Sequence, residues 1–229
     1  MRRQLIVCIA LAGCALLASL APTGLAAASA SAPAVRSNRL GLAGYHFRVS
    51  GISRLHVRGK FTVPTSTCGS AARYYQLQIG AGFRRSGSNR DVVAIVALKC
   101  KNGVQGTGYV QLVAGYFAID PATPIKAGEQ LTIAVTVEGS RSAVRVGLPG
   151  GKSDYLSGSG GTPEGGDYAL TISSPRPPHF STVTFTDCTA NWLDLSIRHL
   201  GVWDSVTSSG KPDGTVSPLS GGTSFTISS

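Results

Sequence analysis

Residues 131–137 read LTIAVTV, a pattern that places Leu131, Ile133, Val135 and Val137 at alternate positions. Because successive side chains of a β-strand point to opposite faces of the sheet, these four aliphatic side chains share one face. Threonine and alanine occupy the other face. The stretch therefore predicts a half-buried strand of an antiparallel sheet.

A second stretch, residues 92–98 (VVAIVAL), is apolar on both faces. It predicts a central strand that is covered on two sides. The dipeptide Asn102-Gly103 follows it and favours a tight hairpin. We therefore expect residues 108–118 to pair antiparallel with residues 91–100.

Similar short segments recur along the chain, separated by Gly, Pro, Asn and Ser, and predict one antiparallel β-sandwich with long loops. Residues 147–166, rich in Gly, Ser and Pro, predict a long mobile loop, and residues 189–214 predict an irregular segment with room for a short helix. Strands are expected at residues 55–63, 74–80, 91–100, 108–118, 131–137, 143–148, 168–172, 182–186 and 224–227.

The start of the 229-residue chain predicts a secretory signal peptide at residues 1–30. Two arginines precede an apolar run at residues 5–20, and residues 28–30 (ASA) have the small-residue form of a cleavage site. One alternative is a lipoprotein signal, because residues 11–14 read LAGC. Another is a retained membrane anchor, for which the run is short.

Cleavage would leave roughly 200 residues, the size of one β-sandwich domain. We expect a flexible lead-in at residues 31–41 and a single domain at residues 42–229. The protein would then be secreted, with no membrane contact once the signal is removed.

Three of the five cysteines, Cys68, Cys100 and Cys188, lie beyond the predicted signal. Export permits disulfides, and three thiols can form one bridge. We expect a bridge between Cys68 and Cys100, which would join the ends of two strands. Cys188 would then be free and buried, or would link two copies in a disulfide-bonded dimer.

The formal net charge is +10, from 21 Lys and Arg against 11 Asp and Glu. This surplus would attract anionic partners such as an anionic cell-wall polymer. The basic residues are scattered, without a dense run or the aromatic series of nucleic-acid-binding proteins. A solvated basic surface is the simpler interpretation, and no nucleic-acid partner is expected.

Motifs for metal, cofactor or serine-nucleophile chemistry are missing from the sequence. The four histidines show no metal-ligand spacing, and the cysteines beyond the signal form no C-x-x-C pair. Neither a nucleophile-elbow serine motif nor a phosphate-binding loop is present. We expect no metal and no cofactor.

Three blocks of sequence resemble the glutamic peptidase (eqolisin) family, whose members are secreted acid endopeptidases. They cover nearly all of the chain beyond the signal, in the family's order. The resemblance implies an all-β fold, a concanavalin A-like antiparallel β-sandwich of the jelly-roll type. The blocks are SNRLGLAGY at residues 37–45 with GKFTVPT at 59–65, FSTVTFTDC at 180–188, and the closing segment at 213–227.

In that family a glutamate acts as general base on a water molecule and a glutamine stabilises the oxyanion. The resemblance places Asp167, in GDYA at residues 166–169, at the position of the glutamate. The position of the glutamine, six or seven residues before Cys100, falls on Val93 or Ala94, and neither side chain donates a hydrogen bond. A tryptophan of the family falls near Gln78.

Glutamines on neighbouring strands are candidates to replace the lost one. They are Gln76, Gln78 and Gln111, of which Gln111 is expected to lie best placed, opposite the strand at residues 91–100. Each is also compatible with an ordinary solvent-facing glutamine, and Asp167 with a turn residue. Our candidate catalytic residues are Asp167, Gln111 and Gln78.

Three functions stay open from the sequence. The first is a catalytically impaired or inactive peptidase-family protein that binds a peptide or polysaccharide in the old cleft. The second is an active endopeptidase with Asp167 as general base and a relocated glutamine as oxyanion donor. The third is an exported scaffold that dimerises through Cys188. The deciding observation is whether Asp167 and a glutamine side chain converge in one cleft.

Overall fold

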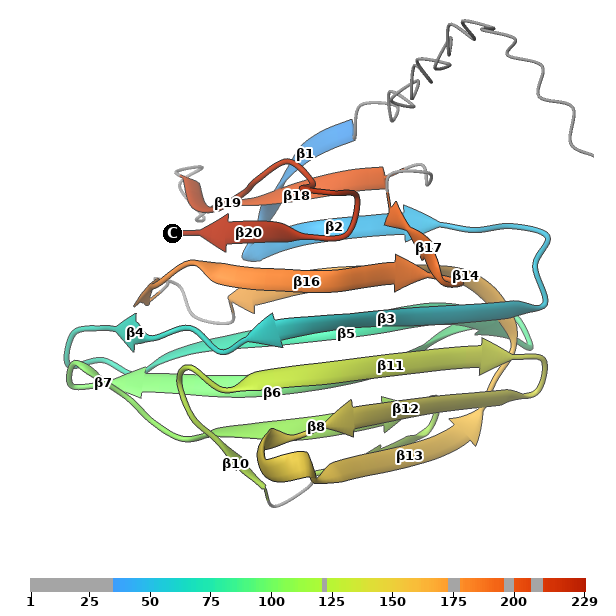
Figure 1. The fold of residues 1–229 in the computed structure, drawn as a ribbon, viewed down its shortest axis with the longest axis horizontal. Helices are drawn as coiled ribbons and strands as arrows, with labels where there is room; N and C mark the ends of the chain where they lie inside the picture. Colours follow the sequence, from blue (N-terminus) through green and yellow to red (C-terminus); the bar gives the residue numbers. More distant parts are fainter. Residues whose placement is uncertain (1–34, 121–122, 173–177, 196–199, 207–211) are drawn as a thin grey trace, which may run out of the picture. The chain divides into compact units, whose positions relative to one another are not determined.

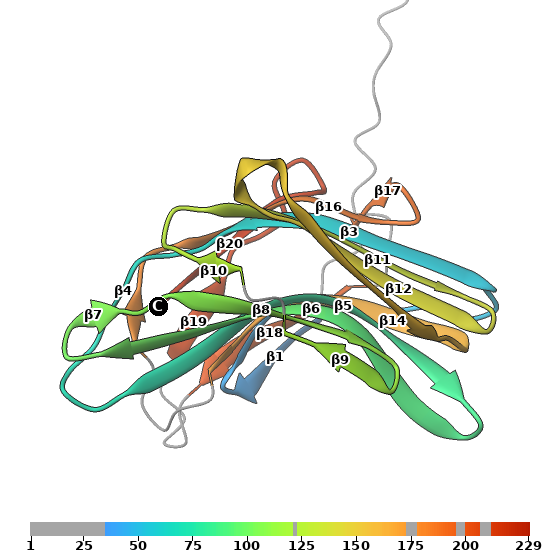
Figure 2. The same cartoon turned by 90° about the horizontal axis from the view of Figure 1, so that it is seen from below.

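The computed structural model describes residues 35–120, 123–172, 178–195, 200–206 and 212–229, which form two β-sheets packed face to face (Figures 1 and 2). We name these layers sheet A and sheet B. The predicted all-β sandwich is confirmed. The predicted signal peptide lies outside the described residues. Within the described ranges, no helix has the length and apolar character needed to cross a bilayer.

Sheet A contains the longest strands of the molecule and is antiparallel except for its parallel first pair, β1 and β18. Its order is β1 (Val35–Leu40), β18 (Leu200–Val206), β2 (Leu42–Arg48), β14 (Thr162–Ile172), β5 (Arg73–Arg85), β6 (Ser88–Lys101) and β8 (Gly108–Ala114), with β7 (Val104–Gln105) paired to β6 and both β9 (Phe117–Ile119) and β10 (Pro124–Ile125) paired to β8.

Sheet B lies in front of sheet A in Figure 1 and is antiparallel. Its order is β13 (Ser153–Ser159), β12 (Arg141–Gly147), β11 (Gln130–Glu138), β3 (Arg54–Thr62), β16 (Val183–Ala190), β20 (Phe225–Ser228) and β19 (Pro212–Val216), with β17 (Leu193–Asp194) paired to β16. Strand β19 also pairs with β18, so it links the two layers. A short ladder joins β4 (Ser66–Thr67) to β15 (His179–Phe180), and one 3-10 turn, η1 (Pro149–Gly151), precedes β13.

The core lies between the sheets and is built from alternate residues of each strand. In β11, Leu131, Ile133, Val135 and Val137 are fully buried, as the alternation predicts. Burying one such side chain stabilises the fold by about 1.5–3 kcal/mol. The intervening residues face outward, which leaves the outer face of each sheet free to carry polar groups.

The apolar strand β6 differs from its prediction. Val92, Ala94 and Val96 are buried in the core, but the other face of the strand is not covered by a second layer. Instead, Val93 and Ile95 line a cavity on the outer face of sheet A. The antiparallel pairing after β6 is confirmed for β8, but the predicted strand at residues 108–118 ends at Ala114, and β9 turns back to pair with β8.

Residues 147–166 form ordered strands and not the predicted long loop. They contain β13 and the start of β14. Their glycines are required by close packing: a Cβ atom on Gly158 would lie 2.2 Å from the carbonyl oxygen of Ala114, and one on Gly161 would lie 2.2 Å from that of Arg84. Glycine here permits contact between backbones, which composition alone does not distinguish from loop flexibility.

Two further segments differ from their predictions. Residues 189–214, predicted to be irregular, contain β17, β18 and the start of β19, and their described part contains no α-helix. The described part of the predicted flexible lead-in forms β1, which pairs in parallel with β18. This pairing satisfies the backbone groups of a segment that is too polar to be recognised by its own sequence.

The disulfide predicted between Cys68 and Cys100 is present, with a Cα–Cα distance of 6.0 Å. It fixes the end of β6 to the segment after β4. Cys188 on β16 is a free thiol with no exposed surface. A disulfide between two copies through Cys188 would therefore require β16 to open.

Candidate functional site

The position of Asp167 is set by its neighbour Tyr168 in β14. The Tyr168 ring is fully buried, and its hydroxyl donates toward the backbone oxygens of Arg58 at 3.1 Å and Thr189 at 2.7 Å. Both acceptors belong to sheet B, so Tyr168 fastens β14 to the opposite layer. Because side chains alternate along a strand, Asp167 points to the outer face of sheet A.

Gln78 reaches Asp167 from the adjacent strand β5. In the register of these strands, Gly80 lies opposite Asp167 and Gln78 lies opposite Ala169. Gln78 and Gly80 are two residues apart and share the outer face. The Nε2 of Gln78 donates a hydrogen bond to Oδ2 of Asp167 at 2.5 Å. A carboxylate and a carboxamide thus converge on one face of the sheet.

Gly80 keeps the space beside the carboxylate open. A Cβ atom at this position would lie 3.2 Å from Oδ1 of Asp167 and 3.0 Å from the side chain of Val93. Such contacts are tighter than ordinary van der Waals packing, so a larger residue would displace Asp167 or Val93. The missing side chain leaves Oδ1 accessible from the cavity.

The cavity around this pair has a volume of about 330 Å³. Apolar side chains form most of its wall, and Asp91 adds a second carboxylate. Its lining residues are Leu42, Gln78, Gly80, Ala81, Asp91, Val93, Ile95, Asp167 and Trp203. Such a mixture of apolar walls and a few converging polar groups is typical of sites that bind small molecules or peptide segments.

Trp203 is held at the cavity by stacking. Its ring lies parallel to that of His46, with the centroids 3.9 Å apart. Gly201, opposite His46 in the register, makes room for this stack, because a Cβ atom there would collide with the imidazole. Burial and the nearby charges of Arg48 and Arg39 lower the pKa of His46, so the stacked imidazole is neutral at pH 7.

Burial raises the pKa of Asp167 to about 6. Its hydrogen bond from Gln78 acts in the opposite direction, and the charge of Asp91 raises the pKa further. The Asp91 carboxyl also has a raised pKa, through its own burial. Asp167 therefore exchanges a proton close to neutral pH, which suits a general base that must later return the proton.

Gln111, the glutamine expected to be best placed, lies elsewhere on the same face of sheet A. Gln111 on β8 lies opposite Ile95 on β6, and Ile95 lies opposite Gln78 on β5. Strand β6 therefore separates the two glutamines. The Nε2 of Gln111 donates to Oδ1 of Asp120 at 3.0 Å. Of the candidate glutamines, Gln78 is the one that the fold brings to Asp167.

Among the cavity residues that were not candidates from the sequence, Trp203 and Asp91 carry the most distinctive side chains. Trp203 lies in the segment predicted to be irregular, although the alternation of Leu200, Val202 and the following residues could have indicated a strand. Asp91 begins an apolar run and has no motif of its own. No hydrogen bond or ion pair joins the Asp91 carboxylate to another described residue.

A metal centre is not built into the described part of the chain. No group of three or more His, Cys, Asp or Glu side chains in these ranges could hold an ion.

Searches by structure find glutamic peptidases. A crystal structure of scytalido-glutamic peptidase with a transition-state analog inhibitor matches 84% of this chain and 99% of that chain, with a TM-score of 0.61 and 15% identity. SCP-B, a member of the Eqolisin family bound to the tripeptide Ala-Ile-His, gives the same values. At this identity the likeness shows a distant glutamic-peptidase-like fold and nothing of the chemistry.

Two comparisons by sequence find no match. No model of a protein family matches the chain, and no curated protein matches it.

Proposed function

We propose that this protein is a secreted endopeptidase in which Asp167 is the general base and Gln78 is the oxyanion donor. The observation that carries the proposal is the hydrogen bond between these two side chains in a partly apolar cavity. The expectation of impaired catalysis rested on the loss of a donor before Cys100 and on an aspartate in place of the family's glutamate. Gln78 supplies a donor from the neighbouring strand, which answers the first of these reasons.

The reaction proceeds by addition of water to the peptide carbonyl. Asp167 takes a proton from the water as its oxygen bonds to the carbonyl carbon. Negative charge then develops on the carbonyl oxygen, where the second N–H of the Gln78 amide donates a hydrogen bond. The C–N bond breaks, the proton on Asp167 passes to the leaving nitrogen, and a carboxylic acid and an amine result.

The strand of origin distinguishes this pair from the arrangement that the family resemblance implies. Val93, one of the two positions matched to the family's glutamine, lies on β6 directly opposite Gly80 and contributes an apolar wall. Gln78 lies on β5, one strand nearer to β14. The shorter reach of aspartate compared with glutamate is matched by a partner that lies closer to it.

The likeness in fold adds to the proposal. The matched peptidases are described in complexes with a transition-state analog or a tripeptide, so a sandwich of this form accommodates peptide-like ligands. A binding module without catalysis would need no carboxylate with a pKa near neutrality, whereas a general base does.

The test is hydrolysis of a denatured protein and a peptide library in ¹⁸O-labelled water between pH 3 and 8. The proposal expects new C-termini that carry ¹⁸O, and their loss in Asp167→Asn. Asp120→Asn, which removes an exposed carboxylate on the same side of sheet A, is the matched control and should retain activity. Absence of cleavage, or equal cleavage by Asp167→Asn, would refute it.

A further inference from the structure

The outer face of sheet B carries a row of cations on each of two strands. Alternation directs the basic residues of β3 and β12 outward while their neighbours fill the core. The outward-facing cations are Arg54, Arg58 and Lys60 on β3, and Arg141 and Arg145 on β12. Since the inward set builds the core, the fold itself does not require the outward set to be basic.

Strand β11 separates the two rows and carries small residues at the middle positions. Ala134 lies between Arg58 and Arg145 in the register, and Thr136 lies between His56 and Ala143. Two strand spacings, about 10 Å, separate β3 from β12. The result is a shallow trough with cations along both sides.

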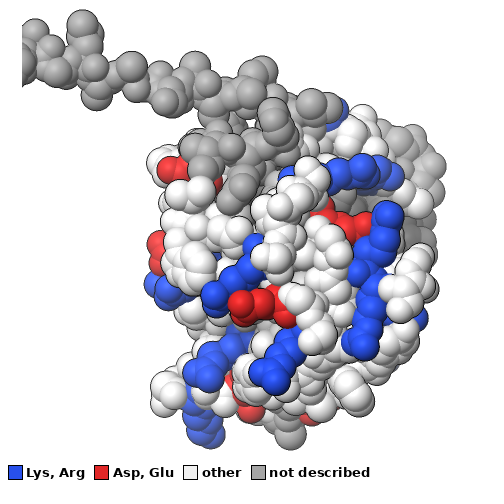
Figure 3. Space-filling model, turned by 90° about the vertical axis from the view of Figure 1, so that its right-hand side faces the viewer, with Lys and Arg blue, Asp and Glu red and all other residues white. Residues whose placement is uncertain are grey.

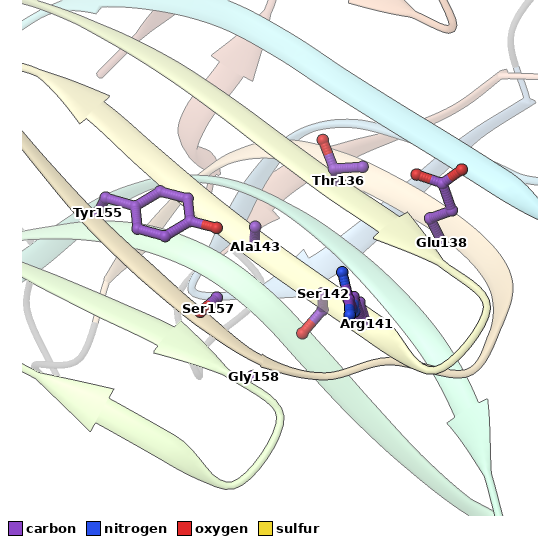
Figure 4. Close-up of a pocket in the computed structure, with 8 residues that line it drawn as sticks. All are labelled: Thr136, Glu138, Arg141, Ser142, Ala143, Tyr155, Ser157 and Gly158. Atoms are coloured by element: carbon purple, nitrogen blue, oxygen red, sulfur yellow. The ribbon is translucent and has the colours of Figure 1, made fainter.

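The trough deepens into a cavity of about 430 Å³ at β12 and β13. Thr136, Ala143 and Ser157 form its floor, and Tyr155, Arg141 and the carboxylate of Glu138 border it (Figure 4). Hydroxyl groups and a methyl group thus line the floor. We call the trough and this cavity together the sheet B groove.

Positive charge on this face exceeds what its own carboxylates neutralise. Glu138 lies 3.6 Å from Arg54, and Asp187 lies 2.7 Å from Lys60. No described carboxylate forms an ion pair with the three remaining cations, Arg58, Arg141 and Arg145. Basic side chains also predominate over acidic ones at the end of the sandwich that adjoins the β11–β12 turn (Figure 3).

An exposed tryptophan borders the groove and is held in an unfavourable backbone conformation. Asn191 and Trp192 form the two-residue turn between β16 and β17, with φ of 52° and 61°. Such turns favour glycine at the second position, because a bulky residue with positive φ is strained. Trp192 is nevertheless 63% exposed, stacked on His56 at 4.6 Å. Strain of this kind is common at functional sites.

Aromatic rings also orient two of the arginines. The Arg54 guanidinium lies 5.7 Å from the centre of the Trp192 ring, and that of Arg145 lies 5.7 Å from the centre of the Tyr155 ring. A guanidinium that is already positioned loses less freedom when it binds an anion. The groove is therefore partly organised before any ligand arrives.

We propose that the sheet B groove binds an acidic polysaccharide. Carboxylate or sulfate groups along such a chain would meet the two rows of cations, and its hydroxyl groups would meet the threonine and serine side chains of the floor. The apolar C–H face of a sugar ring fits against an exposed aromatic ring such as Trp192. The groove lies on the opposite layer from Asp167, so this binding is independent of the proposed peptidase activity.

The binding test uses polygalacturonate, with its methyl-esterified form as a control that has the same backbone without the charge. We expect the protein to bind polygalacturonate, to bind it less tightly as NaCl is added, and to bind the ester weakly. The double variant Arg58→Gln/Arg145→Gln should weaken binding by about tenfold. Lys99→Gln/Lys101→Gln, which removes the same charge from sheet A, should change it by less than about twofold.

Trp192→Gly separates a binding role from a structural one. Glycine suits the turn, so the melting temperature should stay equal or rise while binding to polygalacturonate falls several-fold. Absence of binding, or an equal loss in both double variants, would overturn the proposal. Binding of single-stranded oligothymidylate as tight as that of polygalacturonate would overturn the assignment to a polysaccharide.

Discussion

The outer faces of the two sheets differ in how far their charged side chains are exposed to water. On sheet A, the Asp167 carboxylate is partly withdrawn from water, and burial raises its pKa to about 6. On sheet B, arginine and lysine side chains stand in solvent beside two carboxylates. Withdrawal from water tunes one group for proton transfer, whereas exposure of many charges suits reversible binding that depends on salt.

The largest effect is expected from Asp167→Asn. Removal of the general base should lower kcat by about 10³-fold or more, because the amide cannot accept the proton from water. Binding of polygalacturonate to sheet B should not change. Steady-state kinetics and a binding assay on the same preparation measure both, and a parallel loss of the two would show that the faces are coupled.

Gln78→Ala is expected to have the next largest effect. Loss of the oxyanion donor should lower kcat by about 10²- to 10³-fold with a smaller change in KM. Gln76→Ala, two residues earlier on the same strand face, and Gln111→Ala serve as matched controls. If Gln111→Ala were the more damaging variant, the donor would be the glutamine of β8 and our assignment would fail.

The pH profile reports the environment of Asp167. In the proposed mechanism the carboxylate is the active form, so kcat/KM should fall about tenfold per unit as pH decreases below about 6. Asp91→Asn should move this midpoint to lower pH, because the charge of Asp91 raises the pKa of Asp167. An unchanged midpoint would mean that Asp91 does not act on the base.

Stability should change in the opposite direction to activity. A raised carboxyl pKa means that the folded state binds more protons than the unfolded state between the two pKa values, so stability falls as pH rises from about 4 through about 6. Asp167→Asn removes this cost and should raise the melting temperature by a few degrees at pH 7, with no gain at pH 3. Calorimetry at the two pH values measures it.

The smallest effect is expected when charges on sheet B are removed and peptidase activity is measured. Arg58→Gln/Arg145→Gln should leave kcat/KM for a neutral peptide within about twofold, because these side chains lie on the outer face of sheet B, on the opposite layer from the cavity around Asp167. A tenfold loss would indicate that sheet B contributes to substrate binding, and the two sites would then be one.

Alternation along strands could be read from the sequence with few errors. The four aliphatic residues of LTIAVTV are buried as predicted, and the hairpin after Cys100 pairs β6 with β8. Errors in secondary structure include β13, where glycine and serine suggested a loop, β18, in a segment predicted to be irregular, and β1, predicted to be a flexible lead-in. In these segments tertiary contacts outweigh local preference, since Gly158 and Gly161 admit backbone atoms of other strands.

The sequence by itself determined the all-β class, because alternation is a local property, and it limited the cysteines beyond the predicted signal to one intramolecular bridge, because their number can be counted. The choice of Cys68 with Cys100 was an expectation from strand ends, and the choice of Asp167 came from the resemblance in motif order. Only the tertiary structure decided which glutamine serves that carboxylate. The register between β14 and β5 places Gln78, and not Gln111, beside Asp167. Register is set by packing across the sheet, so no single segment of the sequence encodes it. The raised pKa of Asp167 is likewise a product of the assembled cavity.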